Sequence, residues 1–123
     1  MAQILIVDDS KMQCKAMAQM LEKQGHEVSC VFSGEEAVKQ ALYLIPDVIV
    51  MDVVMPGMNG FQATREITRH KFTEHIPIVL VSGKSQETDR AWGERQGAKG
   101  YLVKPVTEQQ LVEAVNEMLD LYS

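Results

Sequence analysis

Cysteine is scarce in this chain of 123 residues, which contains only Cys14 and Cys30. Two thiols are too few for a disulfide framework, and both fall in segments with the pattern of a helix or a strand, where small buried thiols are common. No apolar run approaches the length that crosses a bilayer, and the first ten residues turn acidic too early for a secretory signal peptide. We therefore expect a cytoplasmic protein with no membrane insertion.

An excess of positive charge is also missing. The 12 Lys and Arg residues are outnumbered by 17 Asp and Glu, which gives a formal net charge of −5. A field of this sign repels nucleic acid. The most basic stretch, Arg65–Lys71, includes Glu66 and is interpreted as a solvated helix end. We expect no direct binding to nucleic acid.

What the chain does contain is the composition of a globular domain, with 46% hydrophobic and 24% charged residues. Its length is enough for one hydrophobic core and too short for two. No linker or low-complexity tract divides it. We therefore expect a single domain over residues 1–123, with no output domain.

Five apolar runs rich in β-branched residues alternate with segments of helical period. Runs such as ILIV and VIVM lack polar alternation, which is typical of parallel strands covered on both faces. The expected strands are Gln3–Val7, Glu27–Phe32, Asp47–Met51, Pro77–Val81 and Lys99–Val103. Short right-handed connections between them predict an α/β fold, a doubly wound, five-stranded parallel sheet with helices on both faces.

The helices are located by periodicity and by their ends. They are expected at Met12–Gln24, from Ser33 or Gly34 onward, at Asn59–Arg69, at Ser85–Gln96 and from Thr107 onward. The first helix is expected to bury a face that includes Ala16 and Gln24. The last is expected to begin with a capping box between Thr107 and Gln110.

Two backbone features are expected near the carboxyl ends of the strands. Gly57 and Gly60 flank a turn after Met55 and Pro56, where they are expected to permit positive φ. The bond between Lys104 and Pro105 is a candidate cis peptide, because proline lowers the cost of the cis form.

Polar side chains stand where four of the five expected strands end. The first strand is followed by Asp8 and Asp9, the third by Asp52, the fourth by Ser82 and the fifth by Lys104. Taken singly, each has an ordinary interpretation as a helix cap, a turn residue or a solvated charge. Because the carboxyl ends of parallel strands meet at one edge, where ligands bind in such sheets, their convergence favours a functional site.

The chemistry of this set points to phosphoryl transfer. Two unit charges about 6 Å apart repel by roughly 3 kcal/mol at an effective dielectric constant near 20, so three clustered carboxylates need a cation or a function that repays this cost. Oxygen ligands suit Mg²⁺. Lys104 adds positive charge and Ser82 a hydrogen-bond donor, which together could stabilise a transferring phosphoryl group. Asp52, the single acid facing Asp8 and Asp9, is the best candidate for the attacking carboxylate.

Four segments resemble, in order, the signatures of the response-regulator receiver family: ILIVDDS, VIVMDVVMPGMNG, PIVLVSG and GAKGYLVKPV. The resemblance spans essentially the whole chain and implies a flavodoxin-like, CheY-like fold with strand order 2-1-3-4-5. It implies that Asp52 accepts a phosphoryl group from a phosphohistidine of a sensor histidine kinase. GFQATREITR and QETDRAWGERQGAKGYLVKPV are similar to receivers of the type IV pilus, twitching-motility chemotaxis-like pathway.

The resemblance also implies how the cofactor Mg²⁺ is held. The side chains of Asp9 and Asp52 and the carbonyl of Val54 would bind the ion, and Asp8 would act through a water molecule. Lys104 would pair with the phosphoryl group.

The same resemblance implies a route for output. Ser82 would be the switch hydroxyl and Tyr101 the aromatic partner that follows it. A downstream protein would bind the face formed by the fourth helix, the fifth strand and the fifth helix. Such a receiver promotes its own phosphorylation and dephosphorylation and is not otherwise an enzyme.

Three other functions fit the sequence less well. A nucleotide- or flavin-binding protein would need a Gly- or hydroxyl-rich phosphate loop after the first strand, where this chain has DDSKMQ. An aspartyl-phosphatase of the haloacid dehalogenase type would need a D-x-D pair there and a cap insertion, for which the chain has no room. A phosphorylation-independent receiver adaptor is disfavoured by the intact set of three aspartates, Ser82 and Lys104.

Overall fold

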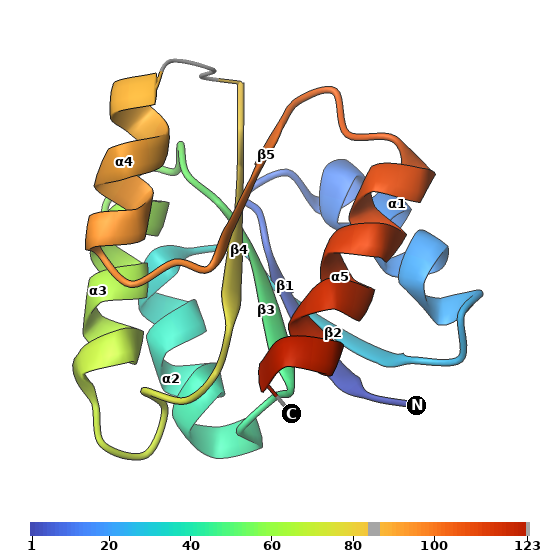
Figure 1. The fold of residues 1–123 in the computed structure, drawn as a ribbon, viewed down its shortest axis with the longest axis horizontal. Helices are drawn as coiled ribbons and strands as arrows, with labels where there is room; N and C mark the ends of the chain where they lie inside the picture. The colour runs from blue at the N-terminus through green and yellow to red at the C-terminus, as the bar shows by residue number, and fades with distance from the viewer. Residues whose placement is uncertain (84–86, 123) are drawn as a thin grey trace.

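The computed structural model describes residues 1–83 and 87–122. Within them, five parallel strands form one sheet in the order β2-β1-β3-β4-β5, as expected (Figure 1). The strands are β1 (Gln3–Val7), β2 (Glu27–Val31), β3 (Val48–Asp52), β4 (Ile78–Ser82) and β5 (Gly100–Val103). The helices are α1 (Lys11–Glu22), α2 (Gly34–Leu44), α3 (Gly60–Arg69), α4 (Glu87–Arg95) and α5 (Glu108–Tyr122).

The sheet is covered on both faces, which explains why its strands are apolar without alternation. Helices α1 and α5 lie on one face and α2, α3 and α4 on the other (Figure 1). Alternate residues of a strand pack into different layers. In β1, Leu5 belongs to the cluster beneath α2 and α3, whereas Ile6 belongs to the cluster beneath α1 and α5.

Helix ends are set by side-chain caps at residues that favour them. The expected capping box of α5 is present, with Thr107 Oγ1 accepting from the N–H of Gln110 at 3.1 Å and Gln110 Oε1 accepting from the N–H of Thr107 at 3.0 Å. A second capping box, between Asn59 and Gln62, begins α3 and was not predicted. Both boxes fix where a helix leaves the carboxyl edge of the sheet.

The strand bounds expected from the sequence are right to within one residue at either end, whereas the expectations for the first helix need correction. Helix α1 buries Cys14, Met17, Ala18 and Leu21. Ala16 and Gln24, expected on that face, are exposed, and Gln24 lies beyond the helix. The first two residues expected in α4, Ser85 and Gln86, lie outside the described residues.

The two glycines of the turn before α3 have different roles. Gly57 has a φ of +73°, as expected. Gly60 does not have a positive φ, so that expectation was wrong. Its N–H donates to the carbonyl of Val53 at 2.9 Å, and a Cβ atom there would meet the carbonyl oxygen of Asp52. Gly60 is therefore required by close approach of the α3 backbone to the end of β3.

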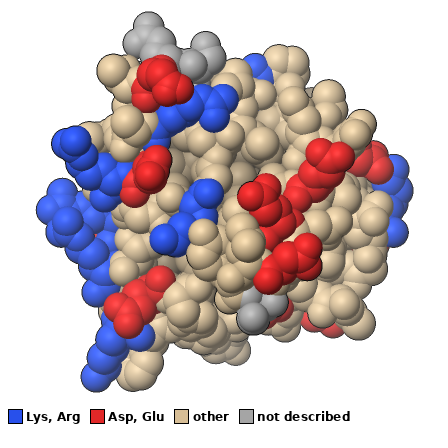
Figure 2. Space-filling view, viewed as in Figure 1, with Lys and Arg blue, Asp and Glu red and all other residues tan. Residues whose placement is uncertain are grey.

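Charge is distributed unevenly over the surface. Acidic side chains lie over α5, while Lys and Arg side chains gather along the edge of the molecule beside α3 and α4 (Figure 2). The exposed acids of α5 include Glu113, Glu117 and Asp120. Among the described residues, no helix combines the length and the apolar character that spanning a membrane requires.

Candidate functional site

Three carboxylates meet at the carboxyl edge of the sheet. Asp8 and Asp9 follow β1, and Asp52 is the last residue of the adjacent strand β3. One carboxylate oxygen from each lies within 4.8 Å of the others. Asp8 is 1% exposed and Asp52 is 5% exposed, whereas Asp9 is exposed. The convergence predicted from the strand ends is therefore present, with two of the acids buried.

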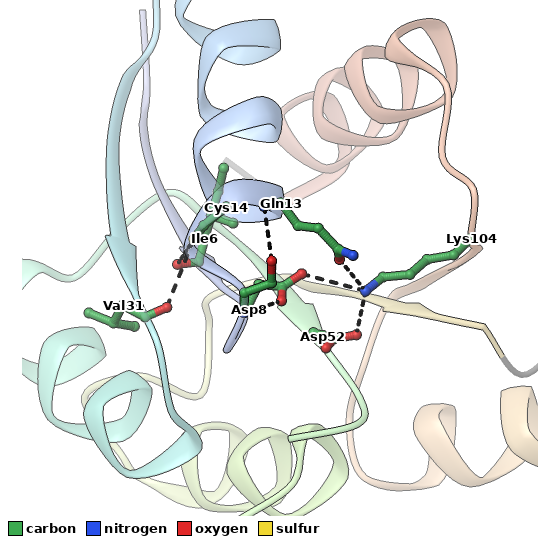
Figure 3. Close-up of polar contacts among 8 residues, drawn as sticks. Ile6, Asp8, Gln13, Cys14, Val31, Asp52 and Lys104 are labelled. Atoms are coloured by element: carbon green, nitrogen blue, oxygen red, sulfur yellow. Dashed lines mark hydrogen bonds and ion pairs between the residues drawn. The ribbon is translucent and has the colours of Figure 1, made fainter. Parts of the chain in front are cut away.

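Local backbone contacts hold Asp8 at this edge. Its N–H donates to the carbonyl of Val31 at 3.2 Å, which extends the pairing of β1 with β2 by one step. Its Oδ1 accepts from the N–H of Ser10 at 2.9 Å, and Ser10 in turn caps α1. Asp8 is thus built into the turn that joins β1 to α1, and its other oxygen, Oδ2, points toward the site (Figure 3).

The ammonium group of Lys104 enters the same cluster from the segment after β5. Its Nζ lies 3.1 Å from Asp52 Oδ1 and 3.5 Å from Asp8 Oδ2 (Figure 3). The N–H of Lys104 donates to the carbonyl of Ser82 at 2.8 Å, which ties this segment to the end of β4. The peptide bond between Lys104 and Pro105 is cis, as expected from the sequence.

Burial and the neighbouring acids together outweigh the effect of Lys104 on the charge of Asp52. The pKa of Asp52 is raised above its ordinary value of 3.8, chiefly because burial disfavours the carboxylate, and then because of the charge on Asp8. Contact with Lys104 acts in the opposite direction without cancelling these effects. An additional cation is therefore favoured electrostatically at this position.

The donor set fits Mg²⁺. Carboxylate oxygens are hard ligands, and this ion commonly takes one or two carboxylates together with water and phosphate oxygens. Asp8, Asp9 and Asp52 supply such oxygens close together. Val54, whose carbonyl was expected to contribute, lies in the loop after β3 and is 60% exposed.

The residues expected to carry output lie on β4 and β5. Ser82 ends β4 and is fully buried; the register pairs its neighbour Val81 with Asp52. Tyr101 is half-buried on β5 and pairs in register with Leu80. The guanidinium carbon of Arg90 lies 5.2 Å from the centre of the Tyr101 ring.

One contact of the site was missed from the sequence. Gln13, in the first turn of α1, accepts a hydrogen bond from Lys104 Nζ through its Oε1 at 2.7 Å (Figure 3). No motif marks this position, because the contact depends on how two long side chains meet across the site. The partners of the Lys104 ammonium group therefore come from β3, the β1–α1 turn and α1.

Comparison with known proteins agrees with this geometry. The family model of the response regulator receiver domain matches residues 4–116. The chain is 50% identical over 119 residues to the protein PilH of Pseudomonas aeruginosa, covering 97% of this chain and 98% of PilH.

Solved structures show the same fold. The chemotaxis protein CheY4 of Vibrio cholerae has a TM-score of 0.92 at 31% identity, with 97% of this chain and 99% of CheY4 covered. The receiver domain of the sensor histidine kinase PA1611 of P. aeruginosa, which has a magnesium ion coordinated in its active site cleft, has a TM-score of 0.89 at 28% identity. That match covers 97% of this chain and 98% of the other.

Proposed function

This chain belongs to the response regulator receiver family, and on that premise we propose that it takes up a phosphoryl group on Asp52 and signals through proteins that bind this state differently. The observation that carries the proposal is the contact of 3.1 Å between Lys104 Nζ and Asp52 Oδ1 inside a cluster of carboxylates. Such a cluster combines a nucleophile, cation ligands and a fixed positive charge.

In the proposed reaction, a carboxylate oxygen of Asp52 attacks the phosphorus atom of a phosphohistidine on a sensor histidine kinase. An oxygen–phosphorus bond forms, the phosphorus–nitrogen bond breaks, and its electron pair remains on the imidazole of the donor. Lys104 holds positive charge where the phosphoryl oxygens arrive. Attack of water on phosphorus would later release phosphate and restore the carboxylate, a step that the receiver itself promotes.

The Mg²⁺ cofactor would be held by Asp9 and Asp52 directly and by Asp8 through water, with the carbonyl of Val54 as a further ligand. When bound, Mg²⁺ supplies positive charge that offsets the repulsion between the acids and the phosphoryl oxygens. The magnesium ion coordinated in the active site cleft of the PA1611 receiver domain supports this assignment by analogy.

For output we propose a downstream protein that binds the face formed by α4, β5 and α5. A shallow surface pocket on this face is lined by residues of all three elements, among them Arg90, Tyr101 and Tyr122. The likeness to PilH and to receivers of the type IV pilus chemotaxis-like pathway supports a role in twitching motility. Free thiols at Cys14 and Cys30 accord with a cytoplasmic location.

The proposal is tested by incubating the purified protein with acetyl phosphate and Mg²⁺ and following the gain of one phosphoryl group by intact-protein mass spectrometry. The wild type should be modified, and chelation of Mg²⁺ with EDTA should prevent it. Asp52→Asn should abolish the modification. Asp120→Asn, which makes the same chemical change on the exposed face of α5, should leave it intact. Full modification of the Asp52→Asn protein would show that the acceptor is another residue.

A further inference from the structure

Gln13 lies where it can control the position of Lys104. Its backbone N–H donates to Ser10 Oγ at 3.2 Å, within the N-terminal cap of α1. Its side-chain Oε1 accepts from Lys104 Nζ at 2.7 Å (Figure 3). One residue is therefore anchored through its backbone to the β1–α1 turn and through its side chain to the lysine of the site.

The three acceptors around the ammonium group of Lys104 differ in charge. An ammonium group has three donor protons, and its neighbours are Gln13 Oε1 at 2.7 Å, Asp52 Oδ1 at 3.1 Å and Asp8 Oδ2 at 3.5 Å. The shortest contact is to the one neutral acceptor. Unlike the two carboxylates, the amide holds the ammonium group without neutralising its charge.

The contact of Gln13 also closes a ring of interactions. Asp8 Oδ1 accepts from the N–H of Ser10, Ser10 caps the N–H of Gln13, Gln13 accepts from Lys104, and Lys104 returns to Asp8 Oδ2. Lys104 is 28% exposed and has a long flexible stem, so it would otherwise sample many rotamers. The ring ties its ammonium group to the turn that carries two of the acids.

We propose that Gln13 is a positioning residue for Lys104, which holds the ammonium group against Asp52 so that its charge is in place when the phosphoryl group arrives. The inference rests on the proposed function, because the advantage lies in phosphoryl transfer. Phosphorylation changes Asp52 chemically but leaves Gln13 unaltered. The amide is therefore the neutral contact that Lys104 can keep on both sides of the reaction, beside the longer contact to Asp8.

The surroundings of Gln13 allow the acceptor to be removed with little loss of packing. Gln13 lines a largely apolar pocket together with Met17, Met20, Val81 and Pro105. Methionine has nearly the length of glutamine and suits apolar neighbours. Gln13→Met should therefore preserve α1 while deleting the hydrogen bond, and Gln13→Ala provides a second deletion compatible with a helix. Gln19→Met is the matched control, because Gln19 is also exposed on α1 and carries the same chemical change.

The first measurement needs neither metal nor donor. In nitrogen-15 NMR spectra of the Mg²⁺-free protein, the protons of the Lys104 ammonium group should exchange with water about tenfold faster in Gln13→Met and Gln13→Ala than in the wild type. Lys104→Arg assigns the resonance by removing it. The Gln19→Met spectrum should match the wild type. Unchanged exchange in both Gln13 variants would overturn the proposal.

The second measurement separates this role from general stability. With saturating acetyl phosphate and Mg²⁺, the maximum rate of phosphorylation should fall about tenfold in both Gln13 variants. Their Mg²⁺ affinity, measured by calorimetry, should stay within about twofold of the wild type, because the carboxylates are intact. A wild type that takes up no phosphoryl group would overturn the proposed function and this role together. A reactive wild type equalled or exceeded in rate by the Gln13 variants would overturn the role of Gln13 alone.

Discussion

The ammonium group of Lys104 lies 3.1 Å from the carboxylate of Asp52, yet the pKa of Asp52 is raised rather than lowered. Burial and the charge of Asp8 outweigh the attraction of the lysine. Keeping Asp52 ionised in the metal-free site therefore costs free energy, first from burial and then from repulsion, and a cation or the loss of one acid would reduce this cost. The free energy of unfolding therefore reports how unfavourable the clustered charges of the site are.

Asp52→Asn is expected to raise the free energy of unfolding of the Mg²⁺-free protein by about 1–3 kcal/mol, because it removes one of the three clustered charges. The gain should shrink when Mg²⁺ is saturating, since the ion already offsets the repulsion in the wild type. Urea unfolding with EDTA and with Mg²⁺ measures both quantities, and Asp120→Asn serves as the control. Equal gains in the two conditions would show that the acids do not share one cation site.

The stability gained by the same substitution is expected to depend on pH, with a sign that follows from the raised pKa of Asp52. The folded protein favours protonated Asp52, so ionisation costs stability as the pH rises from the ordinary value of 3.8 through the folded pKa. The stability difference between Asp52→Asn and the wild type should be near zero below pH 3.8 and should reach its full value above the folded pKa. A difference that is constant across this range would show that the carboxylate is not perturbed by folding.

Gly60→Ala is expected to destabilise the protein by about 2 kcal/mol or more, because a Cβ atom there would lie 2.8 Å from the Cα of Val53 and meet the carbonyl oxygen of Asp52. It should also slow phosphorylation by moving the end of β3. Gly83→Ala is the matched control, since a Cβ atom at that position meets nothing within 4 Å. Thermal unfolding of the two variants checks the expectation, which fails if both melt alike.

His26 is expected to make stability fall in mildly acidic solution. Its Nδ1 accepts from the N–H of Ala2 at 3.1 Å, and burial, followed by the N-terminal charge, lowers its pKa below 6.5. Because its pKa is lowered, the stability that neutral His26 contributes to the folded protein is complete above pH 6.5 and is lost as the pH falls through the folded pKa.

The wild type should lose about 1 kcal/mol relative to His26→Gln over this window, because the glutamine oxygen can accept the same hydrogen bond without titrating. Urea unfolding at pH values from about 7.5 down to about 5 would measure the difference. Parallel curves for the two proteins would rule out the contribution of His26.

The sequence predicted the sheet and the site more closely than the helix surfaces. Asp8 and Asp52 each stand at the end of an apolar strand run, and the carboxyl ends of parallel strands lie at the same edge of a sheet. Their proximity could therefore be predicted. The buried face of α1 was predicted less well. Ala16 is apolar enough to suit a core position but small enough to be exposed without cost, so its burial depends on how the helix rotates against the sheet.

The partner of Lys104 on α1 could not be predicted for a different reason. Gln13 and Lys104 meet through long side chains from separate elements, and neither residue type marks the other in the sequence. Likewise, the role of Gly60 does not come from a positive φ, the usual reason for a glycine in a turn. It comes from the close approach of the α3 backbone to the end of β3. Both features depend on tertiary distances of a few ångströms that periodicity does not encode.

Output from the site is expected to pass through Ser82 and Tyr101, whose side chains lie on the same face of the sheet. Leu80 packs into the cluster beneath α2 and α3, and Ser82, two residues later, faces the same side by strand alternation. Tyr101 packs against that cluster too and pairs in register with Leu80. A Cβ atom on Gly93 of α4 would lie 3.6 Å from the Tyr101 ring, so α4 contacts the tyrosine closely.

If Ser82 donates to a phosphoryl oxygen, a hydrogen bond of about 1.5–3 kcal/mol to a charged group is enough to turn a minor packing of this layer into the major one. Tyr101 can then change its exposure, and with it the surface that a partner contacts.

Ser82→Ala should leave phosphorylation of Asp52 largely intact while uncoupling it from partner binding. Tyr101→Ala should change partner affinity with little effect on phosphorylation. Titration of a partner with and without beryllium fluoride, a mimic of the phosphoryl group, measures the coupling. If Ser82→Ala responds to the mimic as the wild type does, the signal leaves the site by another route.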